Sequence, residues 1–277
     1  MRGKKFLRAL IKNYSGLLGF IIICILCFTA LFAPMLAPYH FAEMNMPYRL
    51  SPPSWEHPFG TDPFGRDILS RIIWGTRISL QIGVFSVLIG AFLGLVYGVA
   101  MGYLGGIIDM VGMRFVDIIM SLPLYILAIF IVAILGNSLL NIMIAIGVAT
   151  FPQFARLVRG AVLSVKERAY VESAKALGAT TPRVLFVHIV PNILSSLIVV
   201  MTLRISTVIL TESSLSFIGL GIPPPNPSWG VMVAEGRMFL LGSPWISLIP
   251  GVIIAFMVFG FNLFGDFISD YLNPKNR

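Results

Sequence analysis

The chain has 277 residues, of which 57% are hydrophobic and 12% are charged, and its mean hydropathy is +0.90. A soluble domain of this size does not have that composition, so the lipid bilayer is the expected solvent. The formal net charge of +8 then requires no nucleic acid as a partner, because it reflects membrane topology and contact with anionic headgroups.

Six apolar runs are long enough to cross the hydrocarbon core, which needs about 20 helical residues. The sequence therefore predicts an all-α, polytopic membrane protein whose six transmembrane helices lie at roughly 15–37, 78–101, 115–135, 138–155, 193–217 and 244–268. Pro123 is expected to kink the third span. Cys24 and Cys27 are expected to be small apolar residues of the first span and not a redox pair.

Basic residues are unevenly distributed between the two sides that these spans define. With the N-terminus inside, the inner segments hold fourteen Lys and Arg residues, the outer segments hold five, and Arg204 lies within a span. This bias predicts that both termini are cytoplasmic. The chain divides into 1–77 (tail, first helix and outer segment) and 78–277, a five-helix core with an inner segment at 156–192 and an outer loop at 218–243.

Glycines and charged residues cluster ahead of the second span: Gly60, Asp62, Gly65, Arg66 and Asp67. Such a segment could bind a metal or a carboxylate. The favoured interpretation is structural, with Asp62 and Asp67 capping backbone groups and Arg66 pairing locally. His57 nearby adds no defined metal geometry.

The most informative stretch is the polar interruption at 172–191, between two long apolar blocks. Residues 166–177 are expected to form an amphipathic helix, which Gly178 ends in a left-handed conformation. Its apolar face is expected to hold Tyr170, Val171, Ala174 and Leu177. Its charged face is expected to hold Arg168, Glu172 and Lys175, whose opposite charges partly neutralise one another.

A second helix is expected to follow, with Thr181 as its N-cap and Pro182 as its first residue. Pro191 is expected to break the chain before the fifth span. An unpartnered surface hairpin is one interpretation of this segment. Its apolar content exceeds what a solvated hairpin needs, which favours docking on another protein.

The segment resembles the EAA loop, E-A-A-x3-G-x9-I-x-L-P, of permease subunits in ATP-binding-cassette importers, at Glu172, Ala174, Gly178 and Pro191. It departs from that motif at Ser173, His188 and Val190. The stretch 188–192, His-Ile-Val-Pro-Asn, looks like the variant of the dipeptide, oligopeptide and nickel permeases.

Three further stretches resemble the same family. Residues 59–67 are similar to its G-T-D-x-x-G-R-D segment, and 214–230 to its outer loop between spans five and six. The C-terminal signature is similar at Asn262, Gly265, Asp266, Asp270 and Pro274. Together they resemble the C-type permease subunit of peptide importers, which implies the type I importer fold.

This resemblance implies a second permease, two cytoplasmic ATPase subunits and an outer substrate-binding protein as partners, in a bacterial or archaeal cytoplasmic membrane. It assigns coupling to the ATPase to Tyr170, Glu172, Ala174, Lys175, Leu177, Gly178 and Pro191. The chain contains no G-x-x-x-x-G-K-[ST] loop, so ATP and Mg are expected on the separate subunits. No catalytic, cofactor-binding or metal-binding residue is expected here.

Two charged residues are candidates for the translocation pathway. Arg204 lies about 18 Å along the fifth span, near mid-bilayer, where a cation is costly and usually faces a cavity or a partner. Glu212 lies eight residues further on. Either residue could line a peptide pathway or be satisfied by a neighbouring helix.

Other polar and aromatic positions have two interpretations each. Trp229 could be an interface anchor, as aromatic residues at this depth often are, or Trp229 and Gly230 could help to close the outer mouth and meet the binding protein. Asp266 and Asp270 lie at a helix C-terminus, where carboxylates are disfavoured, so basic partners are expected in the inner segment or the ATPase.

The rival classes are a membrane-embedded enzyme and an ion-coupled carrier. The three histidines, His40, His57 and His188, lie outside the predicted spans, and no H-E-x-x-H motif occurs. Peptides are the favoured substrate, with a nickel chelate or another small ligand as the alternative.

Overall fold

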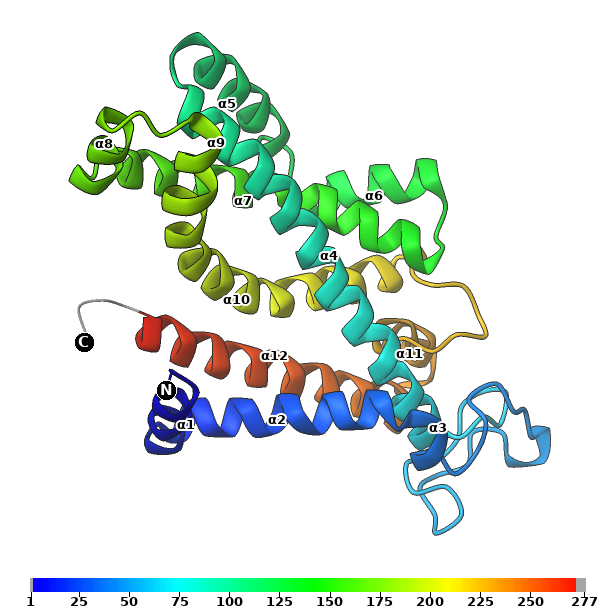
Figure 1. Cartoon of the computed structure of the whole chain (residues 1–277). Helices are drawn as coiled ribbons and strands as arrows, with labels where there is room; N and C mark the ends of the chain where they lie inside the picture. The colour runs from blue at the N-terminus through cyan, green and yellow to red at the C-terminus, as the bar shows by residue number, and fades with distance from the viewer. Residues whose placement is uncertain (1, 273–277) are drawn as a thin grey trace.

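The computed structural model describes residues 2–272, which form a bundle of helices without a named strand (Figure 1). Five helical segments are long and apolar enough to span a membrane: α2 (Tyr14–Leu31), α4 (Ile68–Leu104), α7 (Leu139–Lys166), the composite Thr181–Phe217 and α12 (Trp245–Leu272). A bent pair, α5 (Gly106–Met120) and α6 (Leu124–Leu135), brings the number to six if it is one span. The predicted all-α, polytopic fold is confirmed.

The third predicted span is broken rather than kinked. Helices α5 and α6 meet at an angle of 87°. Pro123 disfavours helical geometry at the residue before it and lacks the N–H that would continue the ladder. The backbone therefore turns sharply at residues 121–123.

The second span begins ten residues earlier than the predicted residue 78, at Ile68. Asp67 caps the helix, because its carboxylate accepts a hydrogen bond of 2.7 Å from the Ser70 N–H. The apolar run did not reveal these first ten helical residues, because Arg71 and Arg77 interrupt it. The predicted domain boundary between residues 77 and 78 thus falls inside one helix.

The outer segment is shorter than predicted and contains α3 (Ala33–Leu36) and η1 (Met46–Tyr48). The fourth span, α7, is longer and runs eleven residues past the predicted end at 155. The chain begins with a helix that was not predicted, α1 (Arg2–Lys12).

Between the fourth and fifth spans lie α8 (Ala169–Ala176), α9 (Thr181–Arg183), the π-helical turn η2 (Val184–Ile189) and α10 (Val190–Phe217). The expected break at Pro191 is wrong. The Val190 N–H bonds five residues back to Leu185, and the Asn192 side chain donates to the His188 carbonyl at 2.6 Å. A widened turn thus accommodates the missing N–H of Pro191, and α9, η2 and α10 form one continuous composite helix.

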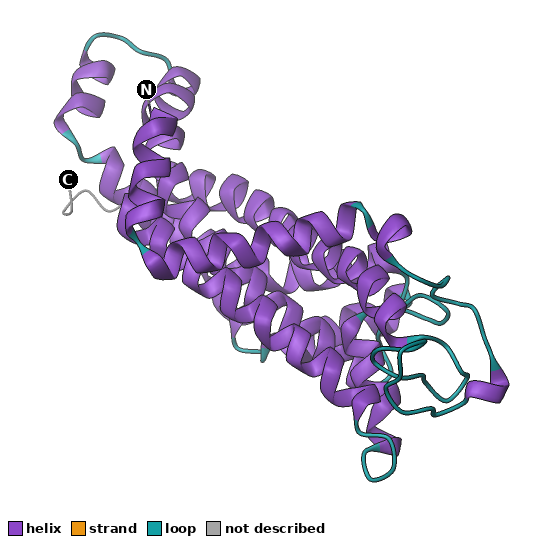
Figure 2. Ribbon diagram, turned by 90° about the horizontal axis from the view of Figure 1, so that it is seen from below, coloured by secondary structure: helices purple, strands orange, loops and turns teal. Residues whose placement is uncertain are grey.

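The two ends of the bundle carry different parts of the chain (Figures 1 and 2). One end holds α1, the end of α12 and the α8–α9 turn. The other holds the segment 37–67 and the outer loop with α11 (Trp229–Gly236) and η3 (Arg237–Phe239). The segments predicted to lie on the same side of the membrane therefore lie at the same end of the bundle. The assignment of the first end to the cytoplasm rests on the charge bias.

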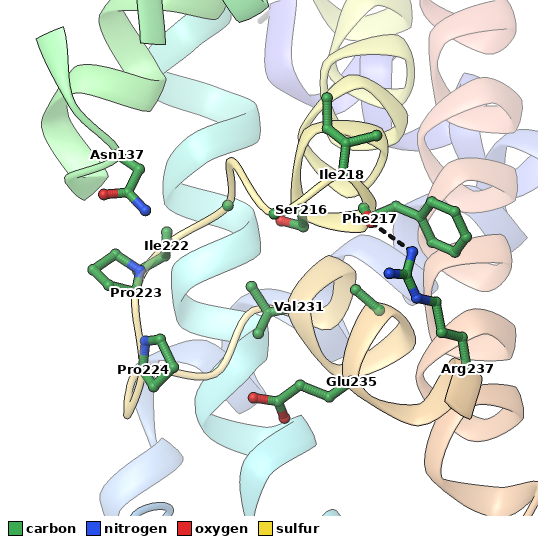
Figure 3. Close-up of a pocket in the computed structure, with 13 residues that line it drawn as sticks. Asn137, Ser216, Phe217, Ile218, Ile222, Pro223, Pro224, Val231, Glu235 and Arg237 are labelled. Atoms are coloured by element: carbon green, nitrogen blue, oxygen red, sulfur yellow. Dashed lines mark hydrogen bonds between the residues drawn. The ribbon is translucent and has the colours of Figure 1, made fainter. Parts of the chain in front are cut away.

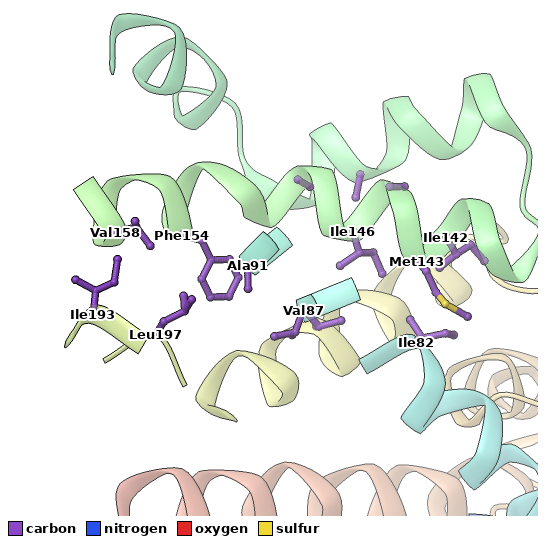
Figure 4. Packing of buried hydrophobic residues seen from close by; sticks show 14 of the residues in the cluster. Ile82, Val87, Ala91, Ile142, Met143, Ile146, Phe154, Val158, Ile193 and Leu197 are labelled. Atoms are coloured by element: carbon purple, nitrogen blue, oxygen red, sulfur yellow. The ribbon is translucent and has the colours of Figure 1, made fainter. Parts of the chain in front are cut away.

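The core lies where α4, α7 and α10 meet (Figure 4). Helix α4 presents glycines at every fourth position to α7, at Gly90, Gly94, Gly98 and Gly102. A Cβ at Gly98 would lie 2.6 Å from the Ala155 carbonyl oxygen, so a larger residue cannot fit there without movement. Such small-residue stripes allow membrane helices to approach closely.

This packing is tested by one substitution at two glycines. Gly94→Ala places a methyl group against Phe154 and should destabilise the folded chain by about 1–3 kcal/mol. Gly160→Ala is the control, because a Cβ there meets nothing within 4 Å. The measurement is the thermal unfolding midpoint in detergent. Equal midpoints for the two variants would contradict the close contact.

Candidate coupling segment and outer mouth

The inner end of the bundle holds α8 through a few buried contacts. Val171 on α8 is fully buried, as are Val184 and Ile189 on the following turn. The Lys175 ammonium lies 5.5 Å from the centroid of the Tyr103 ring, a cation–π contact with the end of α4. Helix α8 is therefore attached to the span that reaches the outer mouth.

Gly178 ends α8 as predicted. Its φ is +81°, and the next N–H, of Ala179, bonds to the Ala174 carbonyl at 3.0 Å. A Cβ at Gly178 would meet nothing within 4 Å, so glycine is required here by backbone conformation and not by space. The second helix begins one residue early, with Thr180 in place of Thr181 at the N-cap position.

The expected single apolar face of α8 is divided. Val171 points into the bundle, whereas Leu177 is 89% exposed and Tyr170 39% exposed. The exposed side borders a cavity of about 600 Å³, lined by Tyr170, Ser173, Ala174, Leu177, Gly178, Ala179, Arg183 and His188. Glu172 is exposed, and among the described residues no ion pair joins it to Arg168. The segment therefore keeps an apolar and charged surface available for another protein.

Two ion pairs that the sequence did not predict attach α5 to α7 at the same end. The Arg159 guanidinium donates to both carboxylate oxygens of Asp109, at 2.5 and 2.6 Å. Arg156 donates to Asp117 at 2.5 Å. Bidentate pairing of the first kind fixes orientation as well as distance.

At the outer end, the cluster at 60–67 is a turn, as favoured from the sequence. The Asp62 carboxylate accepts from the Phe64 and Arg66 N–H groups and pairs with the Arg66 side chain at 2.5 Å. Gly60 and Gly65 have positive φ. Among residues 2–272, no group of three His, Cys, Asp or Glu side chains could hold a metal.

The turn also belongs to a larger buried ion network that the sequence did not reveal. Arg71 on α4 donates to Asp62 at 2.7 Å and to Glu235 on α11 at 3.0 Å. Arg66 reaches the same Glu235 oxygen at 3.3 Å. Both guanidiniums are buried, so the two carboxylates compensate two charges that would otherwise be costly.

His57 lies in the same outer segment and contacts Asp67. Its Nδ1 lies 3.0 Å from the Asp67 carboxylate, which also caps α4. Tyr39 and Tyr48 pack their rings against the imidazole. The histidine therefore supports the helix start.

Trp229 is fully buried and Gly230 is buried, so neither presents a surface to a binding protein in this conformation. The Trp229 indole N–H donates to the Ile72 carbonyl at 3.1 Å. A Cβ at Gly230 would lie 2.6 Å from Ser213 Cα. Both residues fasten α11 to the bundle instead of forming an outer surface.

Glu212 is also buried, and its carboxylate accepts hydrogen bonds of 2.8 Å from Ser216 and Ser228. It therefore holds the loop before α11. Arg204 is half-buried, and no described side chain makes a hydrogen bond with it. The two pathway candidates thus lie in different environments.

A cavity of about 480 Å³ opens at this mouth between the end of α10, the loop 218–224 and α11 (Figure 3). The Glu235 carboxylate faces one side of it, and Arg237 lies on the other, donating to the Phe217 carbonyl at 3.0 Å. Asn137 of the α6–α7 connection completes the rim. The cavity is thus polar at both sides and apolar between them.

The C-terminal signature residues divide by burial. Gly265 is buried against Leu203 of α10, so it permits a close helix contact. Asn262, Asp266 and Asp270 are exposed. The basic partners expected for the two aspartates are not found among the described side chains, and Pro274 lies outside the described residues.

Comparison with known proteins assigns the family. Residues 90–277 match the family described as "Binding-protein-dependent transport system inner membrane component", and residues 2–53 match "N-terminal TM domain of oligopeptide transport permease C". The chain belongs to this permease family. Its members work with ATPase and binding-protein partners, and the chain is a multi-pass protein of the cytoplasmic membrane.

Several relatives align along nearly the whole permease. It is 46% identical over 266 residues to the dipeptide transport system permease protein DppC of Alkalihalophilus pseudofirmus, covering 96% of this chain and 88% of the relative. Identity is 41% over 266 residues to the oligopeptide transport system permease protein OppC of Bacillus subtilis, covering 96% and 87%. The identity is 42% over 274 residues to the glutathione transport system permease protein GsiD of Pectobacterium atrosepticum, covering 98% of this chain and 89% of the relative.

A solved structure supports the fold. The inward-facing MetNI methionine ABC transporter aligns with a TM-score of 0.62 at 21% identity, over 74% of this chain and 98% of that chain. The permease therefore shares the type I importer fold.

The outer ion network yields a stability prediction. Asp62→Asn leaves Arg66 and Arg71 buried with one charged partner, which should cost about 3–5 kcal/mol. Glu56→Gln, at an exposed carboxylate of the same segment, is the control and should cost almost nothing. Both are compared by thermal unfolding of the purified subunit. An Asp62→Asn variant as stable as the control would show that the network contributes little.

Proposed function

We propose that this permease moves di- or oligopeptides across the cytoplasmic membrane by alternating access, driven by ATP hydrolysis on separate subunits. The observation that carries the proposal is the exposed surface of α8, with Tyr170, Glu172 and Leu177 displayed on a helix anchored to the bundle at Val171. Apolar side chains that a free hairpin would hide are expected to insert into a partner.

The complex that we propose contains this chain, a second permease, two cytoplasmic ATPase subunits and an outer substrate-binding protein. ATP and Mg would be bound by the ATPases, and this subunit would contribute no catalytic group. Closure of the ATPases would displace α8, and the attached helices would switch between inward- and outward-open arrangements.

The proposed substrate class rests on the relatives. Those with 41–46% identity are named as dipeptide, oligopeptide and glutathione permeases. A nickel chelate or another small ligand is the alternative substrate.

Coupling is tested by one substitution on α8 and one in the turn that follows it. Glu172→Arg should abolish ATP-dependent peptide uptake while the subunit still inserts. Gly178→Pro should do the same, because proline cannot adopt a φ of +81° and the bend would be lost. Uptake of a labelled dipeptide by proteoliposomes is the measurement, with Glu43→Arg as a charge-reversal control at the opposite end.

Normal uptake by both α8 variants would overturn the coupling role. Uptake of a nickel chelate without peptide uptake by the wild-type complex would overturn the substrate assignment and leave the coupling role intact.

Arg204 is proposed to face the pathway, because it is half-buried and makes no hydrogen bond or ion pair with a described residue. Arg204→Gln should then change the ratio of uptake rates for acidic and basic dipeptides severalfold while the complex assembles normally. Competition uptake assays measure the ratio, and co-purification of the second permease measures assembly. Loss of the second permease would assign Arg204 to the subunit interface instead.

A further inference from the structure

The N-terminal helix α1 has a composition unlike the rest of the chain. Its eleven residues, RGKKFLRALIK, include five basic residues and no acidic one. Asn13 separates α1 from the first span, because its side chain accepts a hydrogen bond of 2.8 Å from the Gly16 N–H and caps α2. Helix α1 is thus a distinct element that lies crosswise to α2 (Figure 1).

One face of α1 packs on the protein. Leu10 is fully buried, and the Phe6 ring lies 5.5 Å from that of Phe267 and 5.2 Å from that of Tyr271, both in edge-on arrangements. These contacts hold α1 against the inner end of α12. The helix is therefore part of the folded bundle.

The other two faces are exposed. Leu7 and Ile11 are 56% and 57% exposed and lie four residues apart on one stripe. Lys5, Arg8 and Lys12 are exposed and fall within an arc of about 60° at 100° per residue. No described carboxylate lies within 4 Å of these three basic groups.

We propose that α1 is an in-plane helix that binds anionic phospholipid headgroups of the inner leaflet and thereby braces α12. The occupant follows from charge complementarity, because a helix with basic residues and no acidic ones attracts an anionic surface. The exposed apolar stripe, about 110° from the basic face, would enter the acyl region while the cations remain at headgroup depth. Helix α1 contacts the last turns of the span α12, a position that agrees with a location at headgroup depth.

The test uses the whole complex, extracted from vesicles of equimolar phosphatidylglycerol and phosphatidylcholine. The ratio of the two lipids that co-purify with it is measured by mass spectrometry. A triple variant, Lys5→Gln with Arg8→Gln and Lys12→Gln, should lose phosphatidylglycerol enrichment, by up to roughly fivefold for each charge removed. A charge-preserving variant, Lys5→Arg with Arg8→Lys and Lys12→Arg, should retain it.

Two results would overturn the proposal. The first is equal phosphatidylglycerol enrichment in the wild type and the triple glutamine variant. The second is loss of the ATPase or the second permease from the triple variant, which would identify a protein as the occupant of the basic face. Neither readout depends on the transported substrate, so a failure here is separate from a failure of the proposed function.

Discussion

The close packing of α4 on α7 is the constraint on which the other features depend. In lipid, helices gain little from the hydrophobic effect, so their association relies on van der Waals contact, which the glycine stripe at 90–102 makes possible. Helix α4 has 37 residues and spans about 55 Å at 1.5 Å per residue. Its outer end holds Arg71, and its inner end holds Tyr103. One packed helix thus joins the outer mouth to the end of the bundle that holds α8.

The continuity of the chain at Pro191 has a mechanical consequence. A break there would have let α9 move independently of the fifth span. The π-helical turn instead joins α9 to α10 in one helical path, and the Lys175–Tyr103 contact attaches α8 to α4. A displacement of α8 is therefore transmitted to two spans at once, which suits a bundle with two alternative arrangements.

Some local features were predictable from the sequence, and long-range pairing was not. Asp67 and Gly178 act through backbone groups within five residues, so their roles follow from the local sequence. Glu235 pairs with Arg71 across 164 residues, and that contact exists only because α11 folds back on α4. The burial of Trp229 has the same cause. The glycines of α4 repeat every four residues, a spacing that indicates a close helix contact, but this contact was not predicted.

The outer loop is a fixed part of the bundle, because three separate bonds fasten it to two spans. Trp229 donates to the Ile72 carbonyl of α4, Glu235 accepts from Arg71 of the same helix, and Ser228 donates to Glu212 of α10. The Arg71 Nε has no hydrogen-bond partner among the described residues, so the network is under-satisfied and favours a defined position more than added stability. Opening of the outer mouth would therefore require α11 to move with α4 and α10 as one body. Because α4 and α10 also contact α8 and η2 at the inner end, movement of these two helices would change the outer cavity and the inner segment together.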